Sequence, residues 1–264
     1  MKEAVILDHV LAIRRQMPRL GTRKLYHLLQ PVLEEEGIKC GRDKLFALLG
    51  REGLFVTRRR KYTVTTNSKH WLKKYPNLIK DTIPTRPEQV WVADITYVPG
   101  EKKHQYLHLI TDAYSKQIMG YELSDDLEAG STLKALKMAI RRRQYPKLPL
   151  IHHSDRGLQY CSRLYTDTLQ QNDIQISMTE NGDPYENPIA ERVNGILKEE
   201  FGLDEPGVES RMQQKQTRES ISIYNRLRPH LSCHMLTPIQ MHKQNKLKIK
   251  TWRNEKAPRN QVIS

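Results

Sequence analysis

The stretch VWVADITYVP, residues 90–99, marks the point where apolar residues change from helical spacing to a strand pattern. Its β-branched and aromatic residues predict a strand. Asp94 stands inside this strand between apolar neighbours, where a charged carboxylate is costly unless it is paired or bound to a metal ion. We therefore expect a partner for Asp94 elsewhere in the chain.

The residues after this strand predict an α/β arrangement. We expect strands at 106–114, 117–124, 148–155 and 174–179, and helices at 131–144, 162–173 and 187–200. With the first strand, the order is β-β-β-α-β-α-β-α, and three strands in succession favour an antiparallel meander.

Two further carboxylates stand at notable places. Asp155 ends the strand LPLIHHSD, and ligands bind at strand ends in α/β sheets. Glu191 lies in the helix NPIAERVNGILKEE, on one stripe with Gly195 and Lys198. A solvated helix face, with Glu191 favoured by the helix dipole, also explains this stripe. Three converging carboxylates suit hard cations such as Mg²⁺, although their spacing alone also arises by chance.

The first 55 residues predict three helices. These are residues 3–17, a helix RKLYHLLQ that Thr22 would cap, and RDKLFALLGREG, which ends near Gly53. The last two, joined by a glycine-bearing turn, resemble a helix-turn-helix. Arg42 and Lys44 would then lie at the exposed start of its second helix and contact DNA. A plain helical bundle is the alternative interpretation.

The net charge of +14 over 264 residues is unevenly distributed. Residues 1–90 hold 19 Lys and Arg against 9 Asp and Glu, residues 91–203 hold 13 against 16, and residues 204–264 hold 12 against 5. Basic flanks around an acidic middle suit a carboxylate site held on a phosphate backbone, although ordinary solubility also requires charge. In the run RRRKY we expect Arg58, Arg59, Arg60 and Lys61 to touch nucleic acid, or to form a solvated hinge.

These patterns predict four segments. They are a helix-turn-helix domain (1–55), a basic linker (56–89), a catalytic α/β core (90–203) and a basic C-terminal helical extension (204–264). No apolar run is long enough to predict a membrane span. The three scattered cysteines fit a reducing cytoplasm without a disulfide framework, and their spacing does not favour a zinc site.

Several of these motifs together resemble a known family. WVADITYV, HHSDRGLQY and ENGDPYENPIAERVNGILKEE are similar to the D, D-35-E core of bacterial insertion-sequence transposases and retroviral integrases. LGTRKLYHLL and the tail YNRLRPHLSCHMLTP, residues 224–238, resemble the second-reading-frame products of two-frame insertion sequences. Within this tail, Tyr224, Arg226, Arg228 and His230 either grip DNA or pack the last helix.

The resemblance implies a ribonuclease-H-like α/β core with a mixed sheet, preceded by an all-α helix-turn-helix domain. It implies that Asp94, Asp155 and Glu191 form a catalytic triad that binds two Mg²⁺ or Mn²⁺ ions. It also implies that Lys198 contacts the end of the element, and that the reaction is DNA cleavage and strand transfer through a circular intermediate.

The partners implied by the resemblance are double-stranded DNA, as terminal inverted repeats and as target, and second copies of the chain on that DNA. The upstream-frame protein, separate or fused, is a further implied partner, and the location is the cytoplasm at the nucleoid. Two rival functions are a non-catalytic DNA-binding regulator and a ribonuclease-H-like nuclease that never joins strands. The intact triad argues against the first rival, and the tail at 224–238 argues against the second.

Overall fold

A five-stranded mixed sheet forms the centre of the chain. The computed structural model describes residues 2–57, 71–80, 82–101, 103–180 and 187–251. The sheet has the order β3-β2-β1-β4-β5. Strands β1, β2 and β3 form the predicted antiparallel meander, while β4 and β5 run parallel to β1. The strand bounds are β1 (Val90–Pro99), β2 (His104–Asp112), β3 (Ile118–Ser124), β4 (Leu150–Ser154) and β5 (Ile174–Met178).

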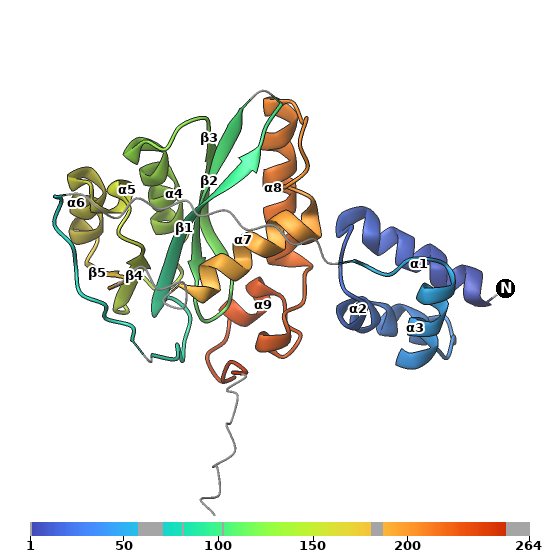
Figure 1. Cartoon of the computed structure of the whole chain (residues 1–264). Helices are drawn as coiled ribbons and strands as arrows, with labels where there is room; N and C mark the ends of the chain where they lie inside the picture. Colours follow the sequence, from blue (N-terminus) through green and yellow to red (C-terminus); the bar gives the residue numbers. More distant parts are fainter. Residues whose placement is uncertain (1, 58–70, 81, 102, 181–186, 252–264) are drawn as a thin grey trace, which may run out of the picture.

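Helices cover both faces of this sheet (Figure 1). Helices α4 (Ala129–Arg141), α5 (Leu158–Cys161) and α6 (Arg163–Gln171) lie on one face, and α7 (Pro188–Phe201) and α8 (Ser210–Arg226) lie on the other. The alternation along β2 builds both cores, because Leu107 and Leu109 pack toward α7 and α8 while Ile110 packs toward α4. The predicted element order is confirmed, with the single turn of α5 as an addition.

The contact between α4 and β3 requires a glycine. A Cβ atom added at Gly120 would lie 2.0 Å from the carbonyl oxygen of Ala135. The helix backbone therefore lies directly on the strand backbone, and this close approach fixes α4 beside the sheet.

Three helices form the N-terminal part, as predicted: α1 (Lys2–Gln16), α2 (Thr22–Glu35) and α3 (Arg42–Arg51). The prediction that Thr22 caps α2 is wrong, because Gly21 occupies the N-cap and Thr22 is already helical. Helix α2 also runs past Pro31, five residues beyond the predicted end. The apolar stripe of Leu25 and Leu29 continues to Leu33, whose burial holds the extra turn.

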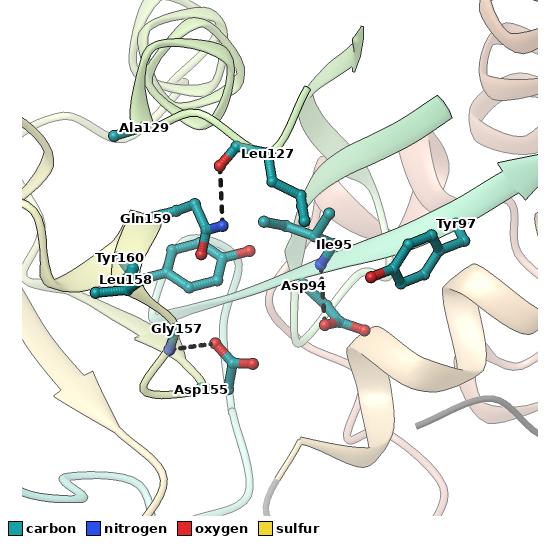
Figure 2. Close-up of a pocket in the computed structure, with 10 residues that line it drawn as sticks. All are labelled: Asp94, Ile95, Tyr97, Leu127, Ala129, Asp155, Gly157, Leu158, Gln159 and Tyr160. Carbon is teal, nitrogen blue, oxygen red and sulfur yellow. Dashed lines mark hydrogen bonds between the residues drawn. The ribbon is translucent and has the colours of Figure 1, made fainter. Parts of the chain in front are cut away.

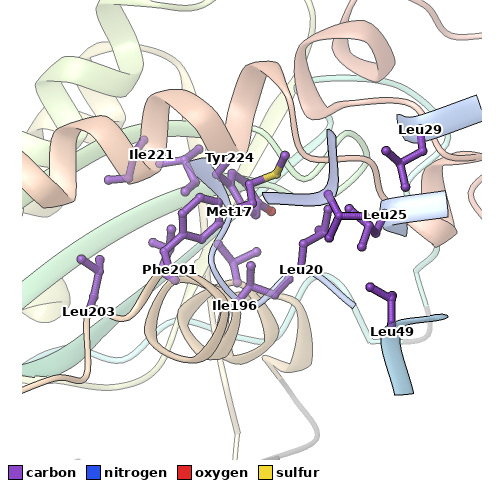
Figure 3. Close-up of a cluster of buried hydrophobic side chains, with 14 of the residues drawn as sticks. Met17, Leu20, Leu25, Leu29, Leu49, Ile196, Phe201, Leu203, Ile221 and Tyr224 are labelled. Carbon is purple, nitrogen blue, oxygen red and sulfur yellow. The ribbon is translucent and has the colours of Figure 1, made fainter. Parts of the chain in front are cut away.

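The N-terminal helices join the core through the α1–α2 connection (Figure 3). Met17 and Leu20 are buried in one cluster with Ile196 of α7 and Tyr224 of α8. The backbone amide of Arg19 also donates to a carbonyl oxygen at the end of α7, with a distance of 3.1 Å. Apolar burial thus fixes this connection against α7 and α8.

Part of the predicted linker packs along the sheet edge. The amide of Met178 donates to the Pro76 carbonyl at 3.2 Å, and the amide of Leu78 donates to Ser177 Oγ at 2.8 Å. Leu72 and Tyr75 pack against the core, whereas Trp71 is 92% exposed. Residues 71–78 are therefore attached to β5, and the basic run Arg58–Lys61 lies outside the described residues.

The tail motif fastens the C-terminal helices onto the sheet. The Asn225 side chain accepts from the Ile118 amide at 2.9 Å and donates to the Ile118 carbonyl at 3.0 Å, so it completes the edge strand β3. Tyr224 donates to the Lys116 carbonyl at 2.9 Å. Tyr224, Arg228 and His230 are buried and pack within the core, while Arg226 is exposed. No helix in the described part of the chain is long and apolar enough to cross a membrane.

A buried ionic network anchors α9 (Pro238–His242), which follows the 3₁₀ turn Leu231–Cys233. His242 lies between Glu88, at 3.4 Å, and Asp112, at 3.7 Å, and all three side chains are inaccessible to solvent. Burial alone would lower the pKa of His242, but the hydrogen bonds and charges of Asp112 and Glu88 raise it to about 9. Asp112 also accepts from the Ser115 amide at 2.7 Å, so it holds the turn that follows β2.

We expect this network to make stability fall in mildly alkaline solution. His242 has a folded pKa above its unfolded value, so its contribution is complete below about pH 6.5 and is lost as pH rises through 9. The two values correspond to a loss on the order of 3 kcal/mol in the free energy of unfolding. Urea unfolding between pH 6 and 10 measures this loss. The same decline in a His242→Leu variant would contradict the assignment.

Candidate active site

Two of the three predicted acids share one pocket (Figure 2). Asp94 in the middle of β1 and Asp155 directly after β4 both line a cavity of about 460 Å³. They meet because β1 and β4 are parallel neighbours whose register pairs Val92 with His153, so the middle of β1 lies level with the carboxyl end of β4. The other lining residues come from β1 and from the segment around α4 and α5: Ile95, Tyr97, Leu127, Ala129, Gly157, Leu158, Gln159 and Tyr160.

The Asp94 carboxylate is held in place by two donors. Its Oδ1 accepts from the backbone amide of Ile95 at 2.9 Å, and its Oδ2 accepts from Asn194 Nδ2 at 2.6 Å. Burial, then the charge of Asp155 and the smaller effect of Glu191, raise the pKa of Asp94 to about 7, against the lowering effect of both hydrogen bonds. Burial beside Asp155 therefore makes the charged form of Asp94 unfavourable in this pocket.

Asp155 is oriented by the turn that follows β4. Its Oδ1 accepts from the backbone amide of Gly157 at 2.9 Å. A Cβ atom added at Gly157 would lie 3.0 Å from that same oxygen, so a side chain there would crowd the carboxylate. The turn after β4 thus orients Asp155 at the strand end, and it needs a small residue at position 157.

Glu191 lies in the first turn of α7, and two asparagines on its side of the helix bind β1. Asn187 Nδ2 donates to the Ala93 carbonyl at 2.9 Å, and Asn194 binds Asp94. Glu191 stands four residues after the first and three before the second, so helical geometry places all three on one face. Asn187 occupies the N-cap, but its side chain binds the strand and makes no cap hydrogen bond.

Glu191 itself is exposed and is not among the residues that line the pocket. Burial of part of its side chain raises its pKa. Within the described residues, no group of three or more His, Cys, Asp or Glu side chains is arranged closely enough to hold a metal ion. The structure therefore brings Asp94 and Asp155 together and leaves Glu191 beside them, within reach of electrostatic interaction with Asp94.

The remaining residues of the predicted stripe flank the same site. Lys198 is half-buried, and burial lowers its pKa, while the charges of Asp204 and Asp94 oppose that shift. A Cβ atom added at Gly195 would meet nothing within 4 Å, so packing inside the chain does not require this glycine. The stripe from Glu191 to Lys198 thus borders the carboxylates and offers a cation two turns along the helix.

The predicted DNA contacts of the N-terminal part lie on another region. Arg42 and Lys44 are exposed at the start of α3, and Arg42 forms an ion pair with Asp43 at 2.8 Å. Helix α3 lies beyond α7, away from the sheet (Figure 1). These cations are therefore separate from the carboxylate pocket.

The histidines before Asp155 belong to the core. His152 Nε2 lies 2.9 Å from the Tyr165 hydroxyl, and His153 Nδ1 lies 2.8 Å from Ser177 Oγ. Both rings are buried, and burial lowers the pKa of His152 to about 3. His152 and His153 are therefore buried strand histidines with polar partners in the core.

Known proteins are similar in sequence to this chain over most of its length. The integrase core domain family matches residues 84–184, and a second integrase core domain family matches residues 172–238. The 31 kDa protein of insertion element IS600 from Shigella sonnei is 39% identical over 236 residues, covering 88% of this chain and 86% of that protein. The chain belongs to the insertion-sequence transposases.

Two further relatives support this membership. A putative transposase of IS986/IS6110 from Mycobacterium tuberculosis is 31% identical, covering 84% of this transposase and 80% of the relative. Transposase InsF of IS3A from Escherichia coli K12 is 30% identical, covering 89% and 80%. The predicted family and the predicted DNA transposase function of the DDE integrase type are confirmed.

The fold also has a solved counterpart. A chain of the simian T-cell lymphotropic virus intasome aligns with a TM-score of 0.53 at 18% identity, covering 90% of this transposase and 76% of that chain. The predicted integrase-type α/β fold, preceded by helices, is thereby confirmed.

Proposed function

We propose that Asp94, Asp155 and Glu191 are the catalytic acids of this transposase and hold two divalent cations, Mg²⁺ or Mn²⁺. The pocket shared by Asp94 and Asp155 carries this proposal, because their oxygen ligands suit hard cations. Burial and the charge of Asp155 also raise the pKa of Asp94, and a bound cation would relieve the repulsion between the two carboxylates. Glu191 would complete the set from the adjacent turn of α7.

The proposed reaction is phosphoryl transfer in two steps. Water attacks a phosphodiester at the element end, the P–O3′ bond breaks, and a 3′-hydroxyl is released. That hydroxyl then attacks a phosphorus of another DNA strand in line, and the strand's own 3′-oxygen leaves. Bound divalent cations supply Lewis acidity for the attacking and leaving oxygens. Neither step needs a covalent bond to the enzyme. In the first joining, the two ends of the element would be linked into a circle.

The chain's own residues prepare this site. Asn194 and the Ile95 amide fix the orientation of the Asp94 carboxylate, and Gly157 does so for Asp155. Lys198 would bind a phosphate of the element end from the same face of α7 as Glu191. The open space at Gly195 leaves room for that strand.

The remaining segments would bind and organise DNA. Residues 1–55 would act as a helix-turn-helix domain through Arg42 and Lys44, and the basic linker 56–89 would add Arg58–Lys61. The core 90–203 would perform the chemistry, and the extension 204–264 would fasten it. Bringing two element ends together requires at least two copies, with the upstream-frame protein as a further partner on the nucleoid DNA.

A strand-transfer assay tests the proposal. Purified protein is mixed with a labelled duplex that ends in the element's terminal repeat, with Mg²⁺ or Mn²⁺. Joined products that require the cation would support it. Cleavage without joining would instead favour a nuclease. Binding with neither product, also after fusion to the upstream frame, would favour a regulator.

We expect Asn194 to act as a positioning residue for Asp94. Its amide lowers the pKa of Asp94, so Asn194→Leu should raise that pKa further and leave more of the carboxyl protonated at neutral pH. Joining should slow about 10–100-fold near pH 7, as for other outer partners of metal ligands, and recover partly at higher pH. The pH profile of joining, and NMR titration of Asp94 without metal, measure both effects.

Asn172→Leu is the matched control, because Asn172 donates to the Thr168 carbonyl at 2.8 Å on a helix of the opposite face. An unchanged pH profile in Asn194→Leu would show that the amide has no influence on Asp94.

A further inference from the structure

A second cavity lies on the other side of α7 from the carboxylates. Its volume is about 350 Å³, within the range of small-molecule sites. Ile189, Arg192, Val193 and Ile196 line it, and at 100° per residue they lie roughly half a turn from the Glu191 stripe. The other lining residues come from α2, the turn between β2 and β3, the segment after α8 and the start of α7. They are Lys24, Lys116, Arg228, His230, Leu231, Ser232 and Pro188.

Positive charge exceeds negative charge around this cavity. Lys24, Lys116, Arg192 and Arg228 line it, and Glu200 pairs with two of them, at 3.2 Å from Lys24 and 2.7 Å from Arg228. Among the residues that the structure describes, no carboxylate forms an ion pair with Lys116 or Arg192. The charge of Asp112 also acts on Lys116, so four cations face two carboxylates, and an anion would neutralise the surplus.

All four cations interact electrostatically with His230, at the wall of the cavity. Burial, and then repulsion from Arg228, Lys24, Lys116 and Arg192, lower the pKa of His230 at the cavity wall. Burial and the charge of Arg228 likewise lower the pKa of Lys24 to about 8, despite its pairing with Glu200. Their positive potentials therefore overlap inside the cavity, where low exposure strengthens them.

The rest of the wall is apolar. Ile189, Val193, Ile196 and Leu231 face the same space as the cations. An anion with an apolar part therefore fits better than a bare inorganic ion, and a nucleotide combines a phosphate with the flat face of a base. We propose that this cavity binds a nucleotide phosphate, either from a DNA strand or from a free nucleotide.

Binding there would link three parts of the chain. Lys24 belongs to α2, Arg192 to α7, and Arg228 to the segment after α8. A phosphate between them would neutralise repulsion at the contact between the N-terminal helices and the core, and would stabilise that contact. The site does not depend on the catalytic role proposed for the carboxylates.

Binding measurements without divalent cations test the site. The probes are inorganic phosphate, deoxyadenosine monophosphate and a short single-stranded oligonucleotide, followed by calorimetry and thermal unfolding. Arg192→Gln removes an exposed cation of the cavity, and Lys116→Gln removes a second. Arg218→Gln is the matched control, since Arg218 is exposed on α8 and does not line the cavity.

We expect Arg192→Gln to weaken binding of the nucleotide probe about tenfold, as for loss of one charge-assisted contact, with Arg218→Gln unchanged. If the mononucleotide binds and stabilises the protein in this way, the source is a free nucleotide. If only the oligonucleotide binds, the source is a DNA strand. The salt dependence of its binding should then fall by about one phosphate contact in Arg192→Gln and stay unchanged in Arg218→Gln.

The nucleotide site is refuted if neither the mononucleotide nor the oligonucleotide binds, whether or not inorganic phosphate does. It is also refuted if Arg192→Gln and Lys116→Gln affect binding no more than Arg218→Gln. Because no metal is present, that result would leave the proposed catalytic acids untouched. Loss of DNA joining in carboxylate variants would, conversely, leave this cavity untouched.

Discussion

Asp155→Asn is expected to abolish DNA joining by this transposase while the fold persists. The substitution removes one of two carboxylates that share the pocket, and with it a proposed cation ligand. Loss of several kcal/mol of transition-state stabilisation corresponds to at least about a 10³-fold slower reaction. Single-turnover joining of a pre-cleaved element end measures the chemical step alone.

Asp155→Asn, which should slow joining, should at the same time raise the free energy of unfolding near neutral pH. The charge of Asp155 raises the pKa of Asp94, so the variant should show a lower pKa for Asp94. In the parent, a folded pKa of about 7 means that stability from Asp94 is complete below about pH 4 and is lost as pH rises to 7. That loss is on the order of 4 kcal/mol at most, and the variant should lose less.

Cation binding gives a readout independent of DNA. Mn²⁺ should raise the melting temperature of the parent protein by binding only the folded state, and should have little effect on Asp155→Asn. Asp167→Asn is the control, because Asp167 lies on α6 with 48% of its side chain accessible, does not line the pocket, and pairs with Arg163 at 3.4 Å. Joining or Mn²⁺ stabilisation that survives in Asp155→Asn would overturn the assignment of this acid.

The sequence predicts the core fold because its signals are local. Strand alternation and helical spacing give the element order between residues 90 and 203, and the structure confirms it. The four residues of α5 make a single turn, which is too short to show periodicity. The sequence predicts that α2 ends before Pro31, which is wrong because tertiary burial of Leu33 outweighs the local effect of a proline.

The candidate site is predictable only in part for the same reason. Asp94 and Asp155 are recognisable from a charge within a strand and an acid at a strand end. Glu191 is ambiguous from its stripe alone, and the family resemblance was needed to select it. Asn194 gives no signal in the sequence, because an asparagine in a helix is not unusual and its partner Asp94 lies 100 positions away.

The tail shows how burial decides between two roles. In the sequence, Arg226 and Arg228 are equally good candidates for DNA contacts. The structure places Arg226 at the surface and Arg228 at 1% exposure, facing Glu200. No local pattern separates them, because the difference arises from the path of the chain after α8.

Arg228→Met is expected to cause the largest loss of stability among single substitutions in this tail, about 3–5 kcal/mol in the free energy of unfolding. The Arg228 guanidinium donates to both oxygens of Glu200, at 2.7 and 2.8 Å. The Glu200 side chain is 14% exposed, and within the described residues it would keep Lys24 as its one ion-pair partner. Desolvation of a half-compensated carboxylate is what makes removal of one partner so costly.

Urea unfolding of Arg228→Met, Arg226→Met, Glu200→Met and the double variant Glu200→Met/Arg228→Met tests this argument. Arg226→Met, an exposed neighbour, should stay within about 0.5 kcal/mol of the parent. The double variant should lose less than the sum of the two single losses, since it leaves no buried carboxylate without its arginine. If Arg228→Met were as mild as Arg226→Met, the ion pair would not hold the end of α7 to the tail. Because Lys24 of α2 shares Glu200, the same loss should loosen the N-terminal helices before the sheet unfolds.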